Sequence, residues 1–180
     1  MKKHCLALFT ASVMGLFSVA SSADTTVPGG KIKFEGEVVD ATCAVSSDSI
    51  DQTVILDQVN VQKLATAGKA AGQPKSFTIK LVDCNIGSTA QNASITFTGQ
   101  TDNTVAAALA NTYGAGGATH VALQMFGPDS KAISMGTASG KVSLQTGTNE
   151  LPFSVDYIAT DAASTVGGVS ATATFHVTYS

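Results

Sequence analysis

The C-terminal stretch of the chain alternates strictly between apolar and polar side chains. From residue 169 to residue 179 every odd position is apolar, and every even position is Ser, Thr or His. A period of two residues belongs to an extended strand with one face on a core and the other in solvent, and it excludes an α-helix. The β-branched threonines favour the same conformation, and Gly167-Gly168 just before them indicates a turn or bulge. The pattern predicts a half-buried strand over residues 169–179.

The same alternation recurs along the rest of the chain, with glycine-containing turns between the runs. Short strands separated by such turns are typical of a β-sandwich with immunoglobulin-like topology. A short helix is compatible only with residues 61–71 and 105–110, and Gly68 and Gly72 favour a loop in the first of these. The other strands that we expect lie at residues 54–56, 77–81, 93–99, 121–125, 142–144 and 153–159.

The first residues have the three parts of a secretory signal peptide. Lys2 and Lys3 form a basic start, an apolar run extends from Cys5 to Val19, and small residues end at Ala23. The apolar run has roughly 15 residues, fewer than the 20 or so that a membrane-spanning helix needs. We therefore expect residues 1–23 to be removed on export. An N-terminal membrane anchor that is retained is the alternative.

The charge balance of the exported part argues against phosphate-bearing partners. Without Lys2 and Lys3, eight of the ten basic residues remain, all of them lysine, against 13 acidic residues. A mildly acidic chain without basic clusters offers little to a nucleic-acid backbone. We expect no nucleic-acid partner.

Two cysteines remain after residues 1–23 are removed. Cys5 leaves with the signal peptide, and Cys43 and Cys84 stay in the exported chain. An even pair of cysteines in an oxidising compartment predicts one disulfide, Cys43–Cys84. In the chain-entropy model, closing a loop of this length stabilises the fold by about 4 kcal/mol. A reactive thiol is the alternative, and it would need an activating neighbour.

No pattern of catalytic or metal-binding residues emerges from the sequence. His120 and His176 are more consistent with surface positions than with metal ligands. The glycine-rich residues 114–117 have no Lys-Ser/Thr after them and so do not form a phosphate-binding loop. We expect no catalytic residues, no metal site and no cofactor, and we predict that the chain is not an enzyme. The nearest approach to a calcium loop lacks its spacing and consists of Asp48, Asp51 and Asp57.

A second amphipathic segment lies at the start of the exported chain, behind the Pro28-Gly29-Gly30 hinge. Its even positions are apolar apart from one glycine, and its odd positions from 31 to 37 are charged. It could be an ordinary first strand of the sandwich. It could also pair with another molecule by strand addition, in which backbone bonds give affinity and alternate side chains give specificity. The residues on its even positions are Ile32, Phe34, Gly36 and Val38.

Several short motifs, taken in their order, resemble one known family. They are Gly29-Gly30, Phe34-x-Gly36-x-Val38-Val39, Cys43, Asp51-Gln52-Thr53-Val54, Leu81-x-Asp83-Cys84, Asn149-x-Leu151-Pro152-Phe153, Tyr157, Ala159-Thr160 and Ala173-Thr174-Phe175-x-Val177-x-Tyr179. Each motif alone is common, but their order and their positions at both ends are specific. The whole chain resembles the major subunits of chaperone–usher fimbriae, most closely the type 1 fimbrial subunit.

The resemblance implies an incomplete immunoglobulin-like β-sandwich, the pilin fold, which a donor strand from a neighbouring subunit completes. It implies three regions: a signal peptide at 1–23, a donor-strand extension at 24–36 and a pilin domain at 37–180. The donor residues would be Ile32, Phe34, Gly36 and Val38. The strand beside the acceptor groove, which a chaperone would also recognise, would carry Gly167, Ala171, Ala173, Phe175, Val177 and Tyr179.

The resemblance also implies partners and a location. A periplasmic chaperone would hold the subunit, an outer-membrane usher would assemble it, and other copies of this chain and other fimbrial subunits would be its neighbours in a head-to-tail polymer. The chain would pass through the periplasm to the cell surface and support cell adhesion there as part of the fimbria. Two alternatives remain open: a minor adaptor subunit of the same kind of fimbria, and a self-contained secreted binding domain such as a lectin.

Overall fold

The computed structural model describes residues 29–87 and 91–180. The predicted signal peptide and the first residues of the extension lie outside this part of the chain. The chain divides between Glu37 and Val38 into two units, and every strand that the structure assigns belongs to the second, Val38–Ser180.

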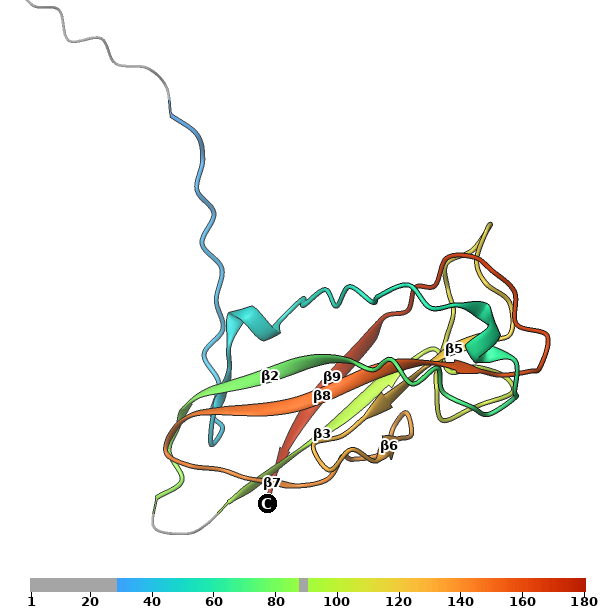
Figure 1. The fold of residues 1–180 in the computed structure, drawn as a ribbon. Helices are drawn as coiled ribbons and strands as arrows, with labels where there is room; N and C mark the ends of the chain where they lie inside the picture. Colours follow the sequence, from blue (N-terminus) through green and yellow to red (C-terminus); the bar gives the residue numbers. More distant parts are fainter. Residues whose placement is uncertain (1–28, 88–90) are drawn as a thin grey trace, which may run out of the picture. The chain divides into compact units, whose positions relative to one another are not determined.

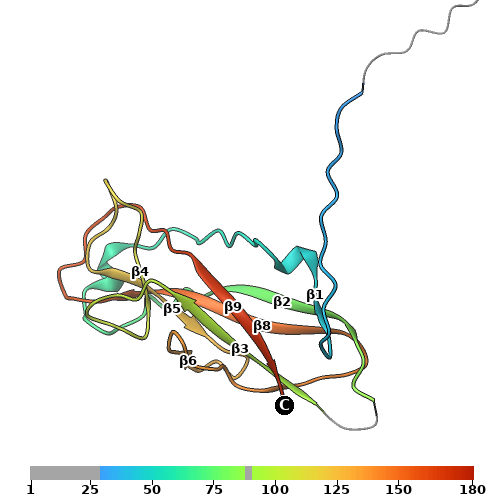
Figure 2. The same ribbon diagram turned by 180° about the vertical axis from the view of Figure 1, so that it is seen from behind.

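The second unit is all-β, and its strands form two antiparallel sheets (Figure 1). The strands are β1 (Ala44–Val45), β2 (Lys75–Cys84), β3 (Asn92–Gly99), β4 (Leu109–Ala110), β5 (Val121–Phe126), β6 (Ala132–Ile133), β7 (Val142–Ser143), β8 (Gly147–Ala159) and β9 (Ala173–Tyr179). The larger sheet has the order β1-β2-β8-β5-β4, with β6 paired to β5, and the smaller sheet has the order β7-β3-β9. Figure 2 shows β3 and β9 side by side from behind.

The longest pairing, between β2 and β8, explains why the sequence alternates as it does. Phe77 lies opposite Phe153 and Ile79 lies opposite Leu151, so the apolar positions of both strands face the same side of the sheet. Side chains in register on one face of an antiparallel pair stabilise it through direct contact. The alternation therefore places one continuous apolar face toward the second sheet.

An aromatic cluster joins the two sheets across the core. Phe77 stacks on Phe153 in the larger sheet at 5.8 Å between ring centroids. Phe97 of the smaller sheet meets Phe153 edge to face at 5.1 Å. Such pairs add about 0.5 to 1.5 kcal/mol beyond the apolar area that they bury. The largest side chains that are fully buried around this cluster are Leu81, Ile95 and Leu151.

Most of the predicted strands are confirmed, with longer bounds for β2 and β8. The strand expected at residues 54–56 is wrong, because these residues lie in no strand. The strand expected at 169–179 begins only at Ala173. Before Ala173 the backbone bonds to a loop instead of a strand: Thr112 donates to the Ser170 carbonyl, and Ala118 donates to the Gly168 carbonyl.

Helix is confined to two short 3₁₀ segments in the described residues, Ser47–Ser49 (η1) and Val61–Leu64 (η2). The side chain of Asn60 caps η2 by accepting a bond from Gln62 N at 2.9 Å. The helix considered at 105–110 is absent, because this stretch forms a turn that runs into β4. Within 29–87 and 91–180 no helix is long and apolar enough to cross a membrane.

Candidate functional site

One edge of the smaller sheet lacks a strand partner. β9 pairs with β3 on one side, and no strand among the described residues pairs with its other side. The apolar positions of β9 and the residues just before it are only partly buried, although their side chains pack against the main core. An edge with unpaired N–H and C=O groups above a half-open apolar face is suited to receive another strand. The partly buried positions are Val169, Ala171, Ala173, Phe175, Val177 and Tyr179.

Residues 52–59 form the opposite wall of this opening. They continue along the edge of the larger sheet, where the Gln52 side chain donates to the Thr78 carbonyl of β2 at 3.4 Å. Val54 and Leu56 pack against the main core from this wall, and Ile55 between them is exposed. The wall thus has the alternation of a strand, but its backbone is not paired with a neighbouring strand as that of a strand would be. We call the space between this wall and residues 169–179 the acceptor groove.

A hydrogen bond and a disulfide close one end of the acceptor groove, here called its base. The Tyr179 hydroxyl donates to the Cys43 carbonyl at 3.1 Å, which joins the end of β9 to the residue just before β1. The predicted disulfide Cys43–Cys84 is confirmed and links the same residue to β2. Burial raises the pKa of Tyr179, so the phenol keeps the proton that it donates.

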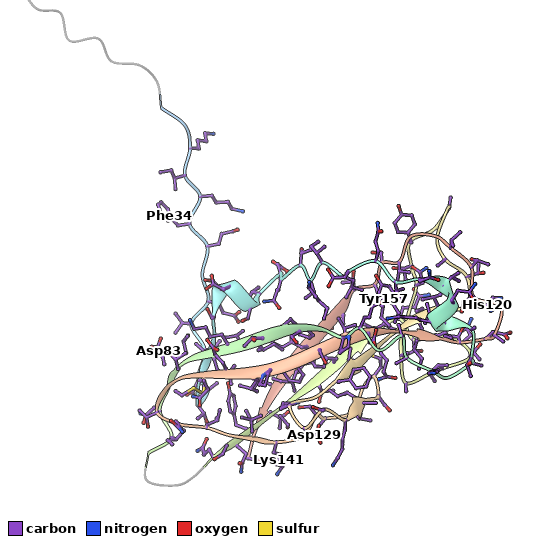
Figure 3. The ribbon with its side chains drawn as sticks, viewed as in Figure 1. Phe34, Asp83, His120, Asp129, Lys141 and Tyr157 are labelled. Atoms are coloured by element: carbon purple, nitrogen blue, oxygen red, sulfur yellow. A yellow bond between two sulfur atoms is a disulfide. The ribbon has the colours of Figure 1, made fainter. Side chains whose placement is uncertain are left out.

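A cavity of about 490 Å³ occupies the other end of the groove, here called its tip. Figure 3 shows Tyr157 and His120 toward this end of the second unit and Asp83 at the opposite end. Small and apolar side chains dominate the lining, so the cavity fits an aliphatic group better than a charged one. The lining residues used below are Val59, Val61, Leu64, Val121, Tyr157 and Val169.

Two glycines fix the backbone at the tip. A Cβ on Gly167 would lie 2.3 Å from the Ala118 nitrogen, and a Cβ on Gly168 would lie 2.4 Å from the Tyr113 ring. Gly168 also exchanges backbone hydrogen bonds with the 116–118 segment, donating to the Gly116 carbonyl at 3.0 Å. Only residues without a side chain permit this approach of one backbone to another. The family resemblance implies a recognition role for Gly167, and the close contact adds a packing reason for a glycine there.

The end of β8 holds the opposite wall of the tip in place. The Tyr157 hydroxyl donates to the Asp57 carbonyl at 3.1 Å. Asp156 is buried, and its carboxylate accepts bonds from the Gly72 and Gln73 N–H groups at 2.8 and 3.0 Å. Burial, and then the negative charges of Asp156 and Asp57, raise the pKa of Tyr157. These bonds anchor the segment that carries η2.

The apolar residues of the expected donor are exposed, whereas those of the groove are partly buried. Ile32 is 78% exposed, Phe34 is 87% exposed and Val38 is fully exposed. Residues 29–40 form no helix or strand in the single chain, although their pattern predicted a strand. A strand needs a neighbouring backbone to bond with, and alternation alone cannot supply one. Gly36 has nothing within 4 Å of an added Cβ.

Sequence reasoning missed the opposite wall as part of this site. The alternation at 54–56 was visible, but it predicted one more paired strand instead of an unpaired wall. The cavity at the tip was missed as well, because η2 and β8 converge there from distant parts of the sequence. The glycines at 68 and 72, read only as loop signals, belong to the segment that Asp156 holds. Both have positive φ, at +75° and +74°.

The polar residues considered for chemistry do not gather at one site. His120 is exposed, with its Nδ1 4.0 Å from the Asp161 carboxylate. His176 points to solvent from β9. Among the residues that the structure describes, no group of three His, Cys, Asp or Glu side chains could hold a metal ion.

Comparisons with known proteins agree on one family. A family model described as Fimbrial protein matches residues 32–180. The S-fimbrial protein subunit SfaA of Escherichia coli O6:K15:H31 is 44% identical over 179 residues, covering 97% of this chain and 96% of its own length. The type-1 fimbrial protein, A chain, of Escherichia coli K12 is 40% identical over 185 residues and covers 99% of this chain and 100% of its own. A solved chaperone–usher pilus subunit has a TM-score of 0.69 and 28% identity, over 87% of this chain and 100% of that one.

Proposed function

This chain belongs to the fimbrial protein family and is a structural subunit of a bacterial fimbria, and from that premise we propose that its copies polymerise by exchanging a strand. The donor is the amphipathic segment from Ile32 to Val38. The receiving site is the acceptor groove of the next copy. The observation that carries the proposal is the unpaired edge of β9, whose apolar side chains lie half-buried above the core.

The donor fits within the length of the groove and matches its apolar chemistry. At about 3.3 Å per residue, the span from Ile32 to Val38 is about 20 Å in an extended strand. The groove offers apolar side chains along a longer stretch, from Val169 to Tyr179. Burying Ile32, Phe34 and Val38 would contribute roughly 5 to 9 kcal/mol. New backbone bonds on both sides of the inserted strand add to this.

The direction of insertion follows from the sheet that the donor completes. Immunoglobulin-like sandwiches consist of antiparallel sheets. A donor antiparallel to β9 would place Ile32 on the side of the base and Val38 toward the cavity at the tip. Val38 then meets a pocket lined by aliphatic side chains, including Val59 and Leu64. The body of the donor subunit would follow directly at the tip.

Such contacts do not close on themselves and therefore build a filament. Each copy donates from one end of its chain and accepts at a groove elsewhere, so the interface is head-to-tail. A subunit with an unfilled apolar groove would aggregate if it were left alone. This hazard is the reason to assign a periplasmic chaperone and an outer-membrane usher as partners during export. The finished polymer would stand at the cell surface and support adhesion.

A single substitution in the donor tests the proposal. Phe34→Glu would bring a charge into the apolar groove and should abolish fibres, while the groove of the same subunit still accepts a strand. Val39→Glu, next to Val38 but on the other phase of the alternation, is the matched control and should leave fibres intact. The measurements are SDS-resistant multimers and electron microscopy of cells that express the complete assembly system. Normal fibres from Phe34→Glu would show that this segment is not the donor.

A further inference from the structure

We propose that the order of charges on the donor, two lysines followed by two glutamates, selects the direction in which the donor enters the groove of a second copy. This inference rests on the proposed strand exchange and names the residues that set its polarity. The lysines are Lys31 and Lys33, and the glutamates are Glu35 and Glu37. The apolar residues of the donor alone would fit the groove in either direction, because both directions bury the same face.

The four charges lie on one face of the donor. In an extended segment, residues two apart point to the same side. The side chains of Lys33 and Glu35 form an exposed ion pair, as expected for such neighbours. Their contact leaves Lys31 and Glu37 as the outermost charges, positive at one end of the donor and negative at the other. Asp40 follows shortly and extends the negative end.

Residues 43–75, which include the opposite wall at 52–59, carry charges in the complementary order, negative toward the base and positive toward the tip. Toward the base, residues 43–56 carry two aspartates, Asp48 and Asp51, and no lysine. Toward the tip, residues 57–75 carry three lysines and one aspartate. That aspartate, Asp57, is already paired with Lys75 at 3.1 Å. The lysines of this stretch outside that ion pair are therefore Lys63 and Lys69, and Lys63 lies in η2 between the two lining residues Val61 and Leu64.

The other wall, residues 169–179, carries no lysine, aspartate or glutamate, so it favours neither direction of the donor. The outward positions of β9 are Thr174, His176 and Thr178, and Thr172 lies just before the strand. Lys80 of β2 lies opposite Glu150 of β8. This pair of opposite charges therefore adds no net charge beside the groove.

The two directions therefore differ electrostatically at both ends. When the donor is antiparallel to β9, its lysines approach Asp48 and Asp51 and its glutamates approach Lys63 and Lys69. In the reversed direction, like charges meet at both ends. One exposed ion pair changes an equilibrium constant by only about 1.4-fold to fivefold. Because reversal replaces attraction with repulsion at two ends, we expect a preference of about tenfold for the antiparallel direction.

The experiment compares two donor peptides of residues 24–41 that differ only in charge order. One is native, and the other carries Lys31→Glu, Lys33→Glu, Glu35→Lys and Glu37→Lys, which keeps the net charge and every apolar residue. The acceptor is the full exported chain, residues 24–180, with Phe34→Glu so that it cannot donate. Fluorescence anisotropy at about 10 mM and at 1 M salt gives the affinities, since the screening length falls from about 30 Å to about 3 Å. Because the apolar face fits either way, the two peptides should bind with similar affinity. At low salt the native peptide should enter antiparallel to β9 and the charge-reversed peptide in the opposite direction, each with a preference of about tenfold that falls below about twofold at 1 M.

Direction is read from cross-links. A benzophenone at the N-terminal end of the native peptide should attach to residues 43–52, and one at the C-terminal end should attach to residues 57–69. The reversed-charge peptide should give the opposite pattern at low salt. An acceptor that also carries Asp48→Lys and Lys63→Glu should lose or invert the direction in which the native peptide enters. Lys141→Glu, beside β7 on the far side of β3 from the groove, is the control and should change nothing.

The outcomes separate this inference from the function on which it rests. The same cross-links from both peptides at low salt would overturn the charge rule and leave strand exchange intact. A preference for one direction that persists at 1 M salt would also overturn the rule. If neither peptide binds, strand exchange and the charge rule fall together.

Discussion

Gly167→Ala is the most informative single substitution at the tip of the groove. The added Cβ would lie 2.3 Å from the Ala118 nitrogen, 2.4 Å from the Gly117 carbonyl carbon and 2.7 Å from the Gly116 oxygen. All three are backbone atoms, so no change of rotamer can relieve the overlap. The two backbones must separate, and the cavity wall beside them must move.

The expected cost follows from what that separation breaks. Overpacking of a tight contact costs about 1 to 3 kcal/mol. Two backbone hydrogen bonds, from Ala118 to the Gly168 carbonyl and from Gly168 to the Gly116 carbonyl, span the same contact. Each is worth about 1 kcal/mol. We therefore expect Gly167→Ala to lower the free energy of unfolding by about 3 to 5 kcal/mol.

Urea unfolding of the unassembled exported chain, followed by circular dichroism, measures this change. Gly114→Ala is the matched control, because Gly114 has φ +83° but nothing within 4 Å of an added Cβ. It should cost only the backbone strain of about 1 to 2 kcal/mol. If Gly167→Ala costs no more than Gly114→Ala, the packing argument is refuted. If it keeps its stability and loses only chaperone binding, the glycine acts by recognition.

Three further predictions concern the bonds that shape the groove. Replacing both Cys43 and Cys84 by Ala should lower the free energy of unfolding by about 4 kcal/mol in the chain-entropy model. Urea unfolding midpoints of the variant and of the oxidised chain measure this change, and a loss below about 1 kcal/mol would contradict the model for this chain. Asp156→Asn should cost about 1.5 to 3 kcal/mol, because an amide nitrogen would face two backbone donors, and unchanged hydrogen exchange in the segment held by Asp156 would speak against it. Burial raises the pKa of Tyr157 and Tyr179, so both folded-state pKa values lie above the unfolded value. The stabilisation of the fold that comes from these shifts is therefore complete below pH about 10 and is lost as the pH rises through the folded-state pKa values. The Tyr157→Phe/Tyr179→Phe double variant should therefore lose less stability at alkaline pH than the native chain, and parallel pH profiles would contradict this.

The sequence predicted the strands of the core well because period two is a local property. Phe153 and Val155 face the core in β8 as their alternation indicates, and Cys43 and Cys84 form the expected disulfide. The same rule failed at Val54 and Leu56, which alternate but belong to no strand. A strand is defined by its hydrogen-bonded neighbour, and nothing in three consecutive residues says whether that neighbour exists.

What the sequence determined alone is the character of the two partners in the proposed exchange. The donor's apolar and charged faces, and the half-buried face of β9, can be read directly because adjacent residues of a strand point to opposite sides. The tertiary structure decided where the open edge lies. It placed residues 52–59 across from β9, joined Tyr179 to Cys43 at the base and brought η2 to the tip. Those contacts depend on residues far apart in the chain, so their geometry exists only once both sheets have formed around the core.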